Sequence, residues 1–290
     1  QITGTQVKDL FAPAGVTRDK IHHTTIMPCF DKKLEASRVD FTDTLLSARD
    51  VDCVLTSAEL VDVFTEQAID FAALPETDIV PSADLAGAGA PSVDLERFLC
   101  SVSDDGTQLV GPVAASAGSG GFLDYVFRAA AAALHGVVLE GSLEFKAGRN
   151  PDFSEVTLEV DGAVVLQFAK AYGFRNISSV VTKMKRGRSP YHFIEIMACP
   201  SGCTNGGGQV KLAAHEDGTL VTPSESRALV SKVDGLLHDR AHLPAPDSEA
   251  SKVTYSRVGG GPGSEAARRV LHTQFRAVPK LPAEALAMKW

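Results

Sequence analysis

The sequence predicts an α/β fold, and three features of the chain indicate it. Short apolar segments at 51–56 and 191–198 have the length and composition of buried strands. Residues 155–169 alternate apolar and polar side chains around an Asp-Gly pair, as the two strands of a hairpin do. Residues 121–135 carry apolar side chains at helical spacing. Because strands and helices are mixed along the chain, we expect largely parallel pairing.

The first elements follow from local signals. Residues 20–28 predict a strand that runs into a proline turn, with Cys29 directly after it. Ser57 is predicted to cap a helix over 58–69. Residues 72–119 are rich in Pro, Ala, Gly, Ser and Asp, which indicates a long loop region and a boundary between two lobes.

The later elements are mostly helices. Gly136 ends the helix predicted over 121–135, and a further helix over 174–187 ends at a glycine. Two more helices are expected near 223–241 and 264–276.

The composition excludes several classes of partner. The chain has 290 residues, of which 44% are hydrophobic, and its net charge is −8. Such a charge provides no overall basic field for nucleic acid or an anionic membrane, so neither is expected as a partner. No apolar run approaches the roughly 18 residues that a membrane span needs. The basic run at 183–188 is interpreted as solvated cations at the end of a helix.

Three of the five cysteines have a pattern that suggests a metal centre. Cys29 and Cys199 each follow an apolar strand, and Cys203 lies four residues further on. Ligands gather at the carboxyl ends of strands in α/β folds. Cys53 is interpreted as a small buried hydrophobe, and Cys100 is assigned no role.

The spacing favours an iron–sulfur cluster over zinc. Zinc sites usually pair two C-x₂-C turns, whereas this chain has C-x₃-C and one distant cysteine. The glycines at 206–208 would let the backbone wrap a bulky group and direct N–H groups at inorganic sulfide.

Two motifs carry a family resemblance. "MPCFDKKLE" (27–35) and "EIMACPSGCTNGGG" (195–208) resemble the second and third signature motifs of the iron-only hydrogenase superfamily. "DKKLEASR", "GSGGFLDYVFR" and "AYGFRNI" resemble its cytosolic iron–sulfur assembly factor branch, the Narf-like type. The resemblance spans nearly the whole chain. It implies a two-lobed α/β fold, with lobes of about 1–112 and 113–290 and a cluster-binding cleft between them.

The resemblance implies a [4Fe–4S] cluster bound by Cys29, Cys199 and Cys203. The family's fourth cysteine and its N-terminal ferredoxin-like segment would lie upstream of Gln1, so the sequence is expected to be an N-terminally truncated piece. Hydrogenases keep a proline where this chain has Val210.

The same motifs place four residues where hydrogenases surround their di-iron site. We expect Lys32 and Glu35 to form an ordinary surface pair, and Met27 and Met197 to fill the core.

The resemblance implies a cytoplasmic assembly factor, with a nuclear pool compatible with it, rather than an enzyme. Such a protein carries [4Fe–4S] clusters and links scaffold proteins to the targeting complex that serves apo-proteins. The alternative is an iron-only hydrogenase that activates hydrogen at a di-iron site. A third hypothesis is that the chain is a metal-free interaction protein that has lost its cluster.

Trp290 is the only tryptophan and the last residue of the sequence. Family members end with an aromatic residue that docks on the targeting complex, so Trp290 is expected to bind its WD-repeat subunit. Lys289 stands where the family prefers an acidic residue or serine, and an inert tail is the other interpretation.

Overall fold

The computed structural model describes residues 1–75, 109–110, 120–148, 150–215, 217–238, 242–243 and 248–274. Cys100, Trp290 and most of the loop region predicted over 72–119 lie outside the described residues. The helices are α1 (Ile2–Thr5), α2 (Asp31–Ala36), α3 (Ser57–Glu66), α5 (Phe122–His135), α6 (Phe174–Lys185), α7 (Pro223–His238), α8 (Glu249–Val258) and α9 (Glu265–Leu271). The strands are β1 (Thr24–Met27), β2 (Thr42–Asp43), β3 (Ala48–Arg49), β4 (Cys53–Thr56), β5 (Leu109–Val110), β6 (Lys146–Ala147), β7 (Phe153–Val160), β8 (Ala163–Tyr172), β9 (Phe193–Met197) and β10 (His242–Leu243).

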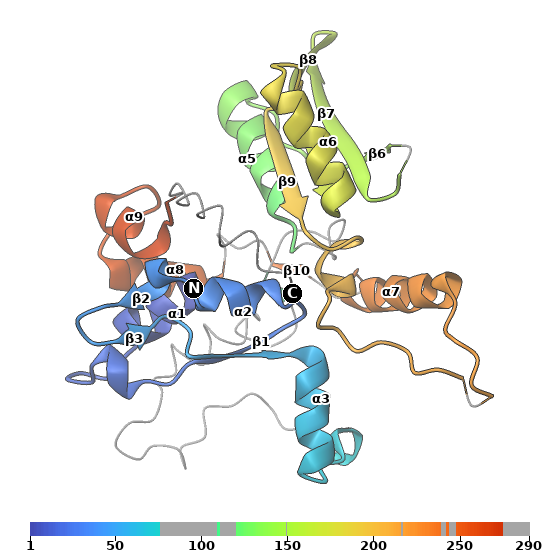
Figure 1. Cartoon of the computed structure of the whole chain (residues 1–290). Helices are drawn as coiled ribbons and strands as arrows, with labels where there is room; N and C mark the ends of the chain where they lie inside the picture. Colours follow the sequence, from blue (N-terminus) through green and yellow to red (C-terminus); the bar gives the residue numbers. More distant parts are fainter. Residues whose placement is uncertain are drawn as a thin grey trace, which may run out of the picture.

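The α/β class is confirmed, and its sheets are parallel and mixed (Figure 1). Among the described strands, β1–β4, β5–β10 and β8–β9 pair parallel. The pairs β2–β3, β6–β7 and β7–β8 are antiparallel. The antiparallel pairs join neighbours along the chain, where a short turn reverses its direction. The division into lobes at 112/113 stays a prediction.

The largest sheet has the order β6-β7-β8-β9, and α5 and α6 cover its two faces (Figure 1). The predicted hairpin is confirmed as β7–β8. Asp161 and Gly162 have φ values of 53° and 77°. Both lie in the left-handed region, which is the geometry of the type I′ turn that the Asp-Gly pair predicts.

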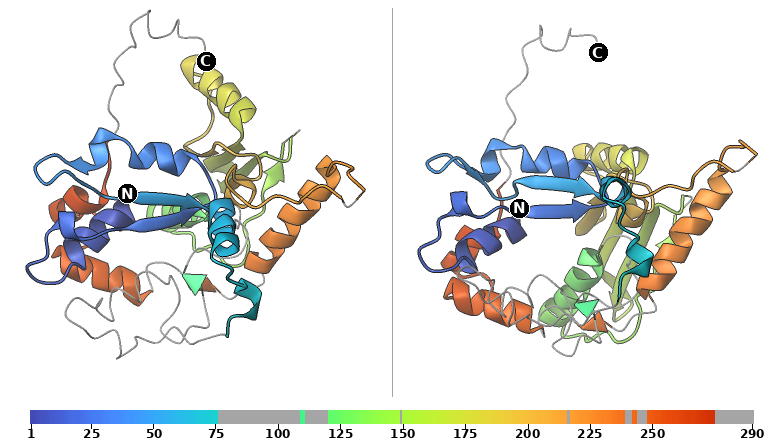
Figure 2. Two further views of the ribbon diagram at one scale, coloured as in Figure 1. Left: turned by 60° about the horizontal axis from the view of Figure 1, so that its bottom comes forward. Right: turned by 90° about the horizontal axis from the view of Figure 1, so that it is seen from below.

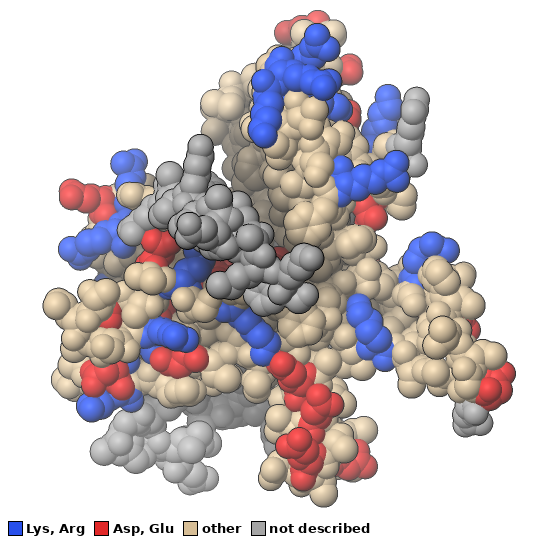
Figure 3. Space-filling model, in the orientation of Figure 1, with Lys and Arg blue, Asp and Glu red and all other residues tan. Residues whose placement is uncertain are grey.

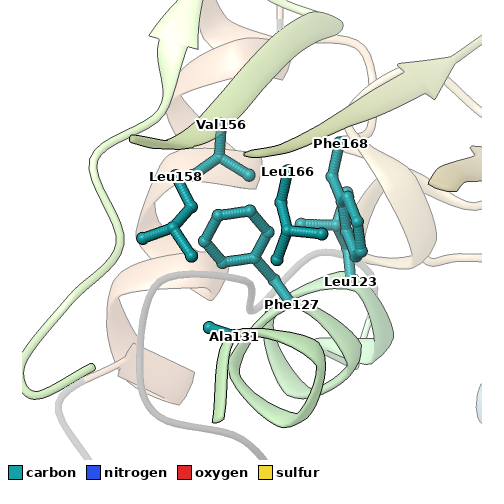
Figure 4. Packing of buried hydrophobic residues seen from close by; sticks show 7 residues of the cluster. All are labelled: Leu123, Phe127, Ala131, Val156, Leu158, Leu166 and Phe168. Atoms are coloured by element: carbon teal, nitrogen blue, oxygen red, sulfur yellow. The ribbon is translucent and has the colours of Figure 1, made fainter. Parts of the chain in front are cut away.

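Alternation along β8 explains how one strand serves two helices. Phe168 points to the α5 side, where its ring meets Phe127 edge-on at 5.0 Å between centroids. Figure 4 shows this core, in which α5 packs on β7 and β8. Its buried members are Leu123, Phe127, Ala131, Val156, Leu158, Leu166 and Phe168. On the opposite face Ala169 and Ala171 are fully buried. Their small side chains allow α6 to pack closely on this face.

A smaller unit surrounds the parallel pair β1–β4. Met27 packs against Ala36, Val51 and Val54. The cap of α3 corrects a prediction: Thr56, not Ser57, is the N-cap residue. Thr56 and Glu59 form a complete capping box, since Thr56 Oγ1 accepts the Glu59 N–H and Glu59 Oε2 accepts the Thr56 N–H.

The last described helices return to the start of the chain. α9 packs on α1 and α8 on the π-helical turn Gln6–Leu10, and both views of Figure 2 show these helices beside the start of the chain. Arg257 donates to the Leu10 carbonyl at 2.8 Å and lies over the Phe11 ring. α8 was not predicted, because its sequence is mostly polar. In the parts of the chain that the structure describes, no helix has the length and apolar character needed to cross a membrane.

Candidate metal centre

Cys29 lies where the first parallel pair ends. β1 stops at Met27, Pro28 turns the chain, and α2 starts at Asp31. The Asp31 N–H donates to Cys29 Sγ at 3.3 Å, so the helix start holds the sulfur in place. Cys29 is half-buried.

Cys199 and Cys203 lie on a tight turn after β9. The Gly173 N–H donates to the Met197 carbonyl at 2.9 Å and fixes the end of the strand. Ser201 has a φ of 60°, which is rare for a residue with a side chain. Its N–H donates to Asp152 Oδ1 at 2.6 Å, from the loop before β7. Cys203 follows in a 3₁₀ turn, Gly202–Asn205, and is exposed.

The glycine loop joins the two cysteine turns. The Gly208 N–H donates to the Pro28 carbonyl at 2.9 Å, and the Ala58 N–H donates to the Gly208 carbonyl at 3.0 Å. A Cβ on Gly206 would lie 2.0 Å from the Pro28 carbonyl oxygen, and one on Gly208 would lie 2.6 Å from a methyl carbon of Thr56. Only glycine permits this backbone contact.

The three predicted cysteines are therefore brought to one place. Burial raises the pKa of the Cys29 thiol, and the charge of Cys199 and a side-chain hydrogen bond with it raise that pKa further. Burial also raises the pKa of Cys203, to which the charges of Cys29 and Cys199 add. Cys53, in β4, is half-buried rather than fully buried and is not part of this group.

The donor set of the site consists of the three thiols of Cys29, Cys199 and Cys203. Among the described residues, no three His, Cys, Asp or Glu side chains are arranged to hold a metal ion. Three thiols without histidine or carboxylate suit iron–sulfur chemistry, because sulfur is the preferred ligand of such clusters. The chemistry of the donor set therefore fits an iron–sulfur cluster.

A buried carboxylate beside this group was missed from the sequence. Glu195 is 5% exposed; its Oε2 accepts the Leu123 N–H at 2.8 Å, and its Oε1 accepts the Tyr172 hydroxyl at 2.5 Å. Lys170 stands opposite Glu195 in the β8–β9 register. Burial lowers the pKa of Lys170, while Glu195 and Asp124 raise it. The sequence does carry a signal for Glu195, because a charged residue inside an apolar strand must find partners.

The expectations for the nearby Lys32, Glu35 and Met27 agree with the structure. Lys32 Nζ and Glu35 Oε2 form a surface pair at 2.8 Å. Met27 belongs to the small core described above. Lys32 nevertheless lies near enough to the thiols to lower the pKa of Cys203, although burial and the other thiols raise it more.

The fold and the cysteine turns together define an iron-only-hydrogenase-like protein. Residues 1–207 match the family described as "Iron only hydrogenase large subunit, C-terminal domain". The chain belongs to this family.

Two relatives indicate the branch of this family that the chain resembles. It is 41% identical to the "Cytosolic Fe-S cluster assembly factor narfl" of Danio rerio, over 100% of this chain and 64% of that protein. It is also 41% identical to the "Cytosolic iron-sulfur assembly component 3" of Mus musculus, over 100% of this chain and 55% of that protein. The expected resemblance to the Narf-like branch is confirmed. The chain thus spans between 55% and 64% of the length of these two relatives.

Solved structures agree on the fold. A variant of the [FeFe]-hydrogenase HydA1 from Chlamydomonas reinhardtii is 24% identical and superposes with a TM-score of 0.70. The match covers 94% of this chain and 68% of that one. The two chains therefore share an architecture.

Proposed function

We propose that this chain is the core of a cytosolic iron–sulfur protein assembly factor. In this proposal Cys29, Cys199 and Cys203 hold a [4Fe–4S] cluster. The protein carries such clusters and links the scaffold proteins to the targeting complex that serves apo-proteins. It acts in the cytoplasm, and it is a carrier rather than an enzyme.

One observation supports the proposal above the others. The backbone contact of the Gly206–Gly208 loop with Pro28 joins the turn of Cys29 to that of Cys199 and Cys203. An accidental meeting of three thiols would not need a loop that excludes side chains at Gly206 and Gly208.

The electrostatics of the thiols supports the same role. Burial and mutual repulsion raise the pKa of Cys29 and Cys203, so their protein surroundings alone disfavour thiolates. Positive iron would relieve that repulsion, because thiolates are the form that binds metal. When bound, a cluster supplies iron and sulfide for transfer. The chain's own residues hold it and shield it with the glycine loop.

The partner proposal depends on the last residue. Trp290 would insert into a pocket of the WD-repeat subunit, since tryptophan provides a large contact area from one side chain. Trp290→Ala should abolish binding of the purified subunit and leave iron uptake unchanged. Retained binding would reject this part of the proposal alone.

The cluster proposal is tested by anaerobic reconstitution with iron and sulfide. Iron and sulfide per chain are measured, together with the visible thiolate-to-iron absorbance. We expect Cys29→Ala, Cys199→Ala and Cys203→Ala each to lose most of the bound iron. Cys53→Ala is the matched control and should keep it. Equal iron uptake by the parent and Cys199→Ala would reject the ligand assignment.

The hydrogenase alternative is tested on the same sample. We expect no hydrogen from reduced viologen and no infrared bands from CO or CN⁻ ligands. Either signal would move the chain to the enzyme class.

A further inference from the structure

The outer side of α6 is exposed, with Phe174 at its start, Val181 further along and most of its cations at its end. We call it the α6 face. It consists of Phe174, Arg175, Val181, Lys185, Arg186 and Arg188. Within α6 only Val180 is fully buried.

The apolar part of this face points away from the sheet. Phe174 is 73% exposed and Val181 is 37% exposed. Phe174 and Val181 are seven residues apart, and Lys185 follows four residues later, so the three lie along one side of the helix. Aromatic side chains exposed in this way are typical of protein interfaces.

The cations of this face have no ion-pair partner among the residues that the structure describes. These cations are Arg175, Lys185, Arg186 and Arg188. Lys183 differs, since it lies over the rings of Phe153 and Tyr191 and belongs to the inner side. Figure 3 shows Lys and Arg side chains gathered at the top of the molecule, where α6 ends. The chain as a whole carries a charge of −8, so this face has the opposite sign.

The α6 face also adjoins the cysteine turn. Gly173 precedes the helix by one residue, and its N–H holds the end of β9. A Cβ on Gly173 would lie 3.5 Å from Pro200, the residue after Cys199. A protein seated on Phe174 would therefore reach the turn that carries Cys199.

We propose that the α6 face docks an acidic protein segment that also carries apolar side chains. The cations would attract the acidic groups, and Phe174 with Val181 would bury the apolar ones. Nucleic acid fits less well, because Phe174 and Val181 offer its phosphates no hydrogen-bond donor. This inference goes beyond the proposed function and does not need a bound cluster.

The test uses the cluster-free chain and a fluorescent synthetic peptide of alternating Glu, Leu, Asp and Phe. A peptide with serine in place of Leu and Phe, and a single-stranded DNA of equal charge, serve as comparisons. Fluorescence anisotropy gives the dissociation constants. We expect the first peptide to bind more tightly than either comparison.

Paired charge reversals locate the binding. Lys185→Glu with Arg188→Glu should weaken it about tenfold or more. Arg227→Glu with Lys232→Glu, on exposed positions of α7, is the matched control and should change it by less than about twofold. Phe174→Ser should weaken binding even in high salt, where charge effects are screened. Circular dichroism checks that the variants stay folded.

Three outcomes would overturn the inference. The first is equal weakening by both double variants, which indicates non-specific charge attraction. The second is DNA binding as tight as that of the peptide. The third is a dimer in sedimentation that the Lys185 and Arg188 reversals dissociate, because the face would then bind a second copy of the chain.

Discussion

The amide N–H of Gly208 donates to the carbonyl oxygen of Pro28 across 2.9 Å, and this bond connects the two cysteine turns. Residues 180 positions apart in the sequence thus meet through main-chain atoms alone. The contact requires the absence of side chains at Gly206 and Gly208, and it can be broken without touching any cysteine.

Gly206→Ala should destabilise the chain and lower its iron uptake on reconstitution. The added methyl would lie 2.0 Å from the Pro28 oxygen, so backbone must move, which costs about 3 kcal/mol. Gly207→Ala is the control, because its methyl would meet the Phe30 ring no closer than 3.4 Å. Urea unfolding and iron uptake check both variants. Equal stability of the two would show that the loop does not press on Pro28.

Thr56→Val should remove the side-chain hydrogen bond that caps α3 and keep the shape of the side chain at position 56. The Glu59 N–H loses its acceptor, at a cost of about 1 kcal/mol. Valine keeps the methyl that packs against Gly208. Ser57→Ala should change the free energy of unfolding by less than about 0.5 kcal/mol. A larger loss in Ser57→Ala than in Thr56→Val would restore the cap predicted from the sequence.

Glu195→Ala should cost about 3 kcal/mol, since the Leu123 N–H and the Tyr172 hydroxyl lose their acceptor and Lys170 loses a nearby negative charge. Glu195→Gln keeps an acceptor for Leu123 and should cost less. Thermal and urea unfolding measure both.

The two Glu195 variants also differ from the parent in their pH dependence. Burial already lowers the pKa of Lys170, so the folded state binds its proton less readily than the unfolded state. Stability then rises with pH as Lys170 loses its proton, below its ordinary value of 10.5. Removing Glu195 should lower the pKa of Lys170 further and widen the pH range over which stability rises. An unchanged profile would show that Lys170 does not depend on Glu195.

Asp52→Asn should unfold more easily at neutral pH. Lys8 is fully buried and bonds to Asp52 Oδ2 at 2.6 Å, and losing that charge costs about 3 kcal/mol. Burial raises the pKa of Asp52, but the His23 N–H and Lys8 lower it more, to a value below its ordinary 3.8.

The pH dependence of Asp52 follows from that sign. The stabilisation that the Asp52 carboxylate gives the folded state is present above pH 3.8, and it is lost as the pH falls through the lower folded-state pKa. The difference between parent and Asp52→Asn should therefore shrink in acid. Asp62→Asn, exposed on α3, is the control. A difference that stays constant down to strong acid would contradict the pairing.

Local signals predicted the elements whose ends are set by nearby residues. The hairpin of β7 and β8 follows from Asp161 and Gly162, and α5 ends at Gly136, which has a φ of 66°. α8 escaped prediction, since its ten residues carry little apolar periodicity. The helix cap was misplaced by one residue because Thr56 and Ser57 have equivalent side-chain chemistry, and only the backbone distinguishes them.

The cysteines of the candidate site could be grouped from the sequence because Cys29 and Cys199 each follow a strand, with Cys203 four residues after Cys199. The contacts that hold them could not be predicted in this way, because they are long-range. Glu195 bonds to Leu123, 72 residues away, and Ser201 to Asp152, 49 residues away. No periodicity or spacing encodes such pairs.

Ser201 stands between Cys199 and Cys203 in a left-handed conformation that a side chain disfavours by about 1–2 kcal/mol. The Asp152 carboxylate holds it there through the Ser201 N–H. If that carboxylate is removed, the turn can relax toward an ordinary backbone shape and change the separation of the two sulfur atoms. The separation of the Cys199 and Cys203 sulfur atoms thus depends on Asp152, which lies on a loop that contains no cysteine.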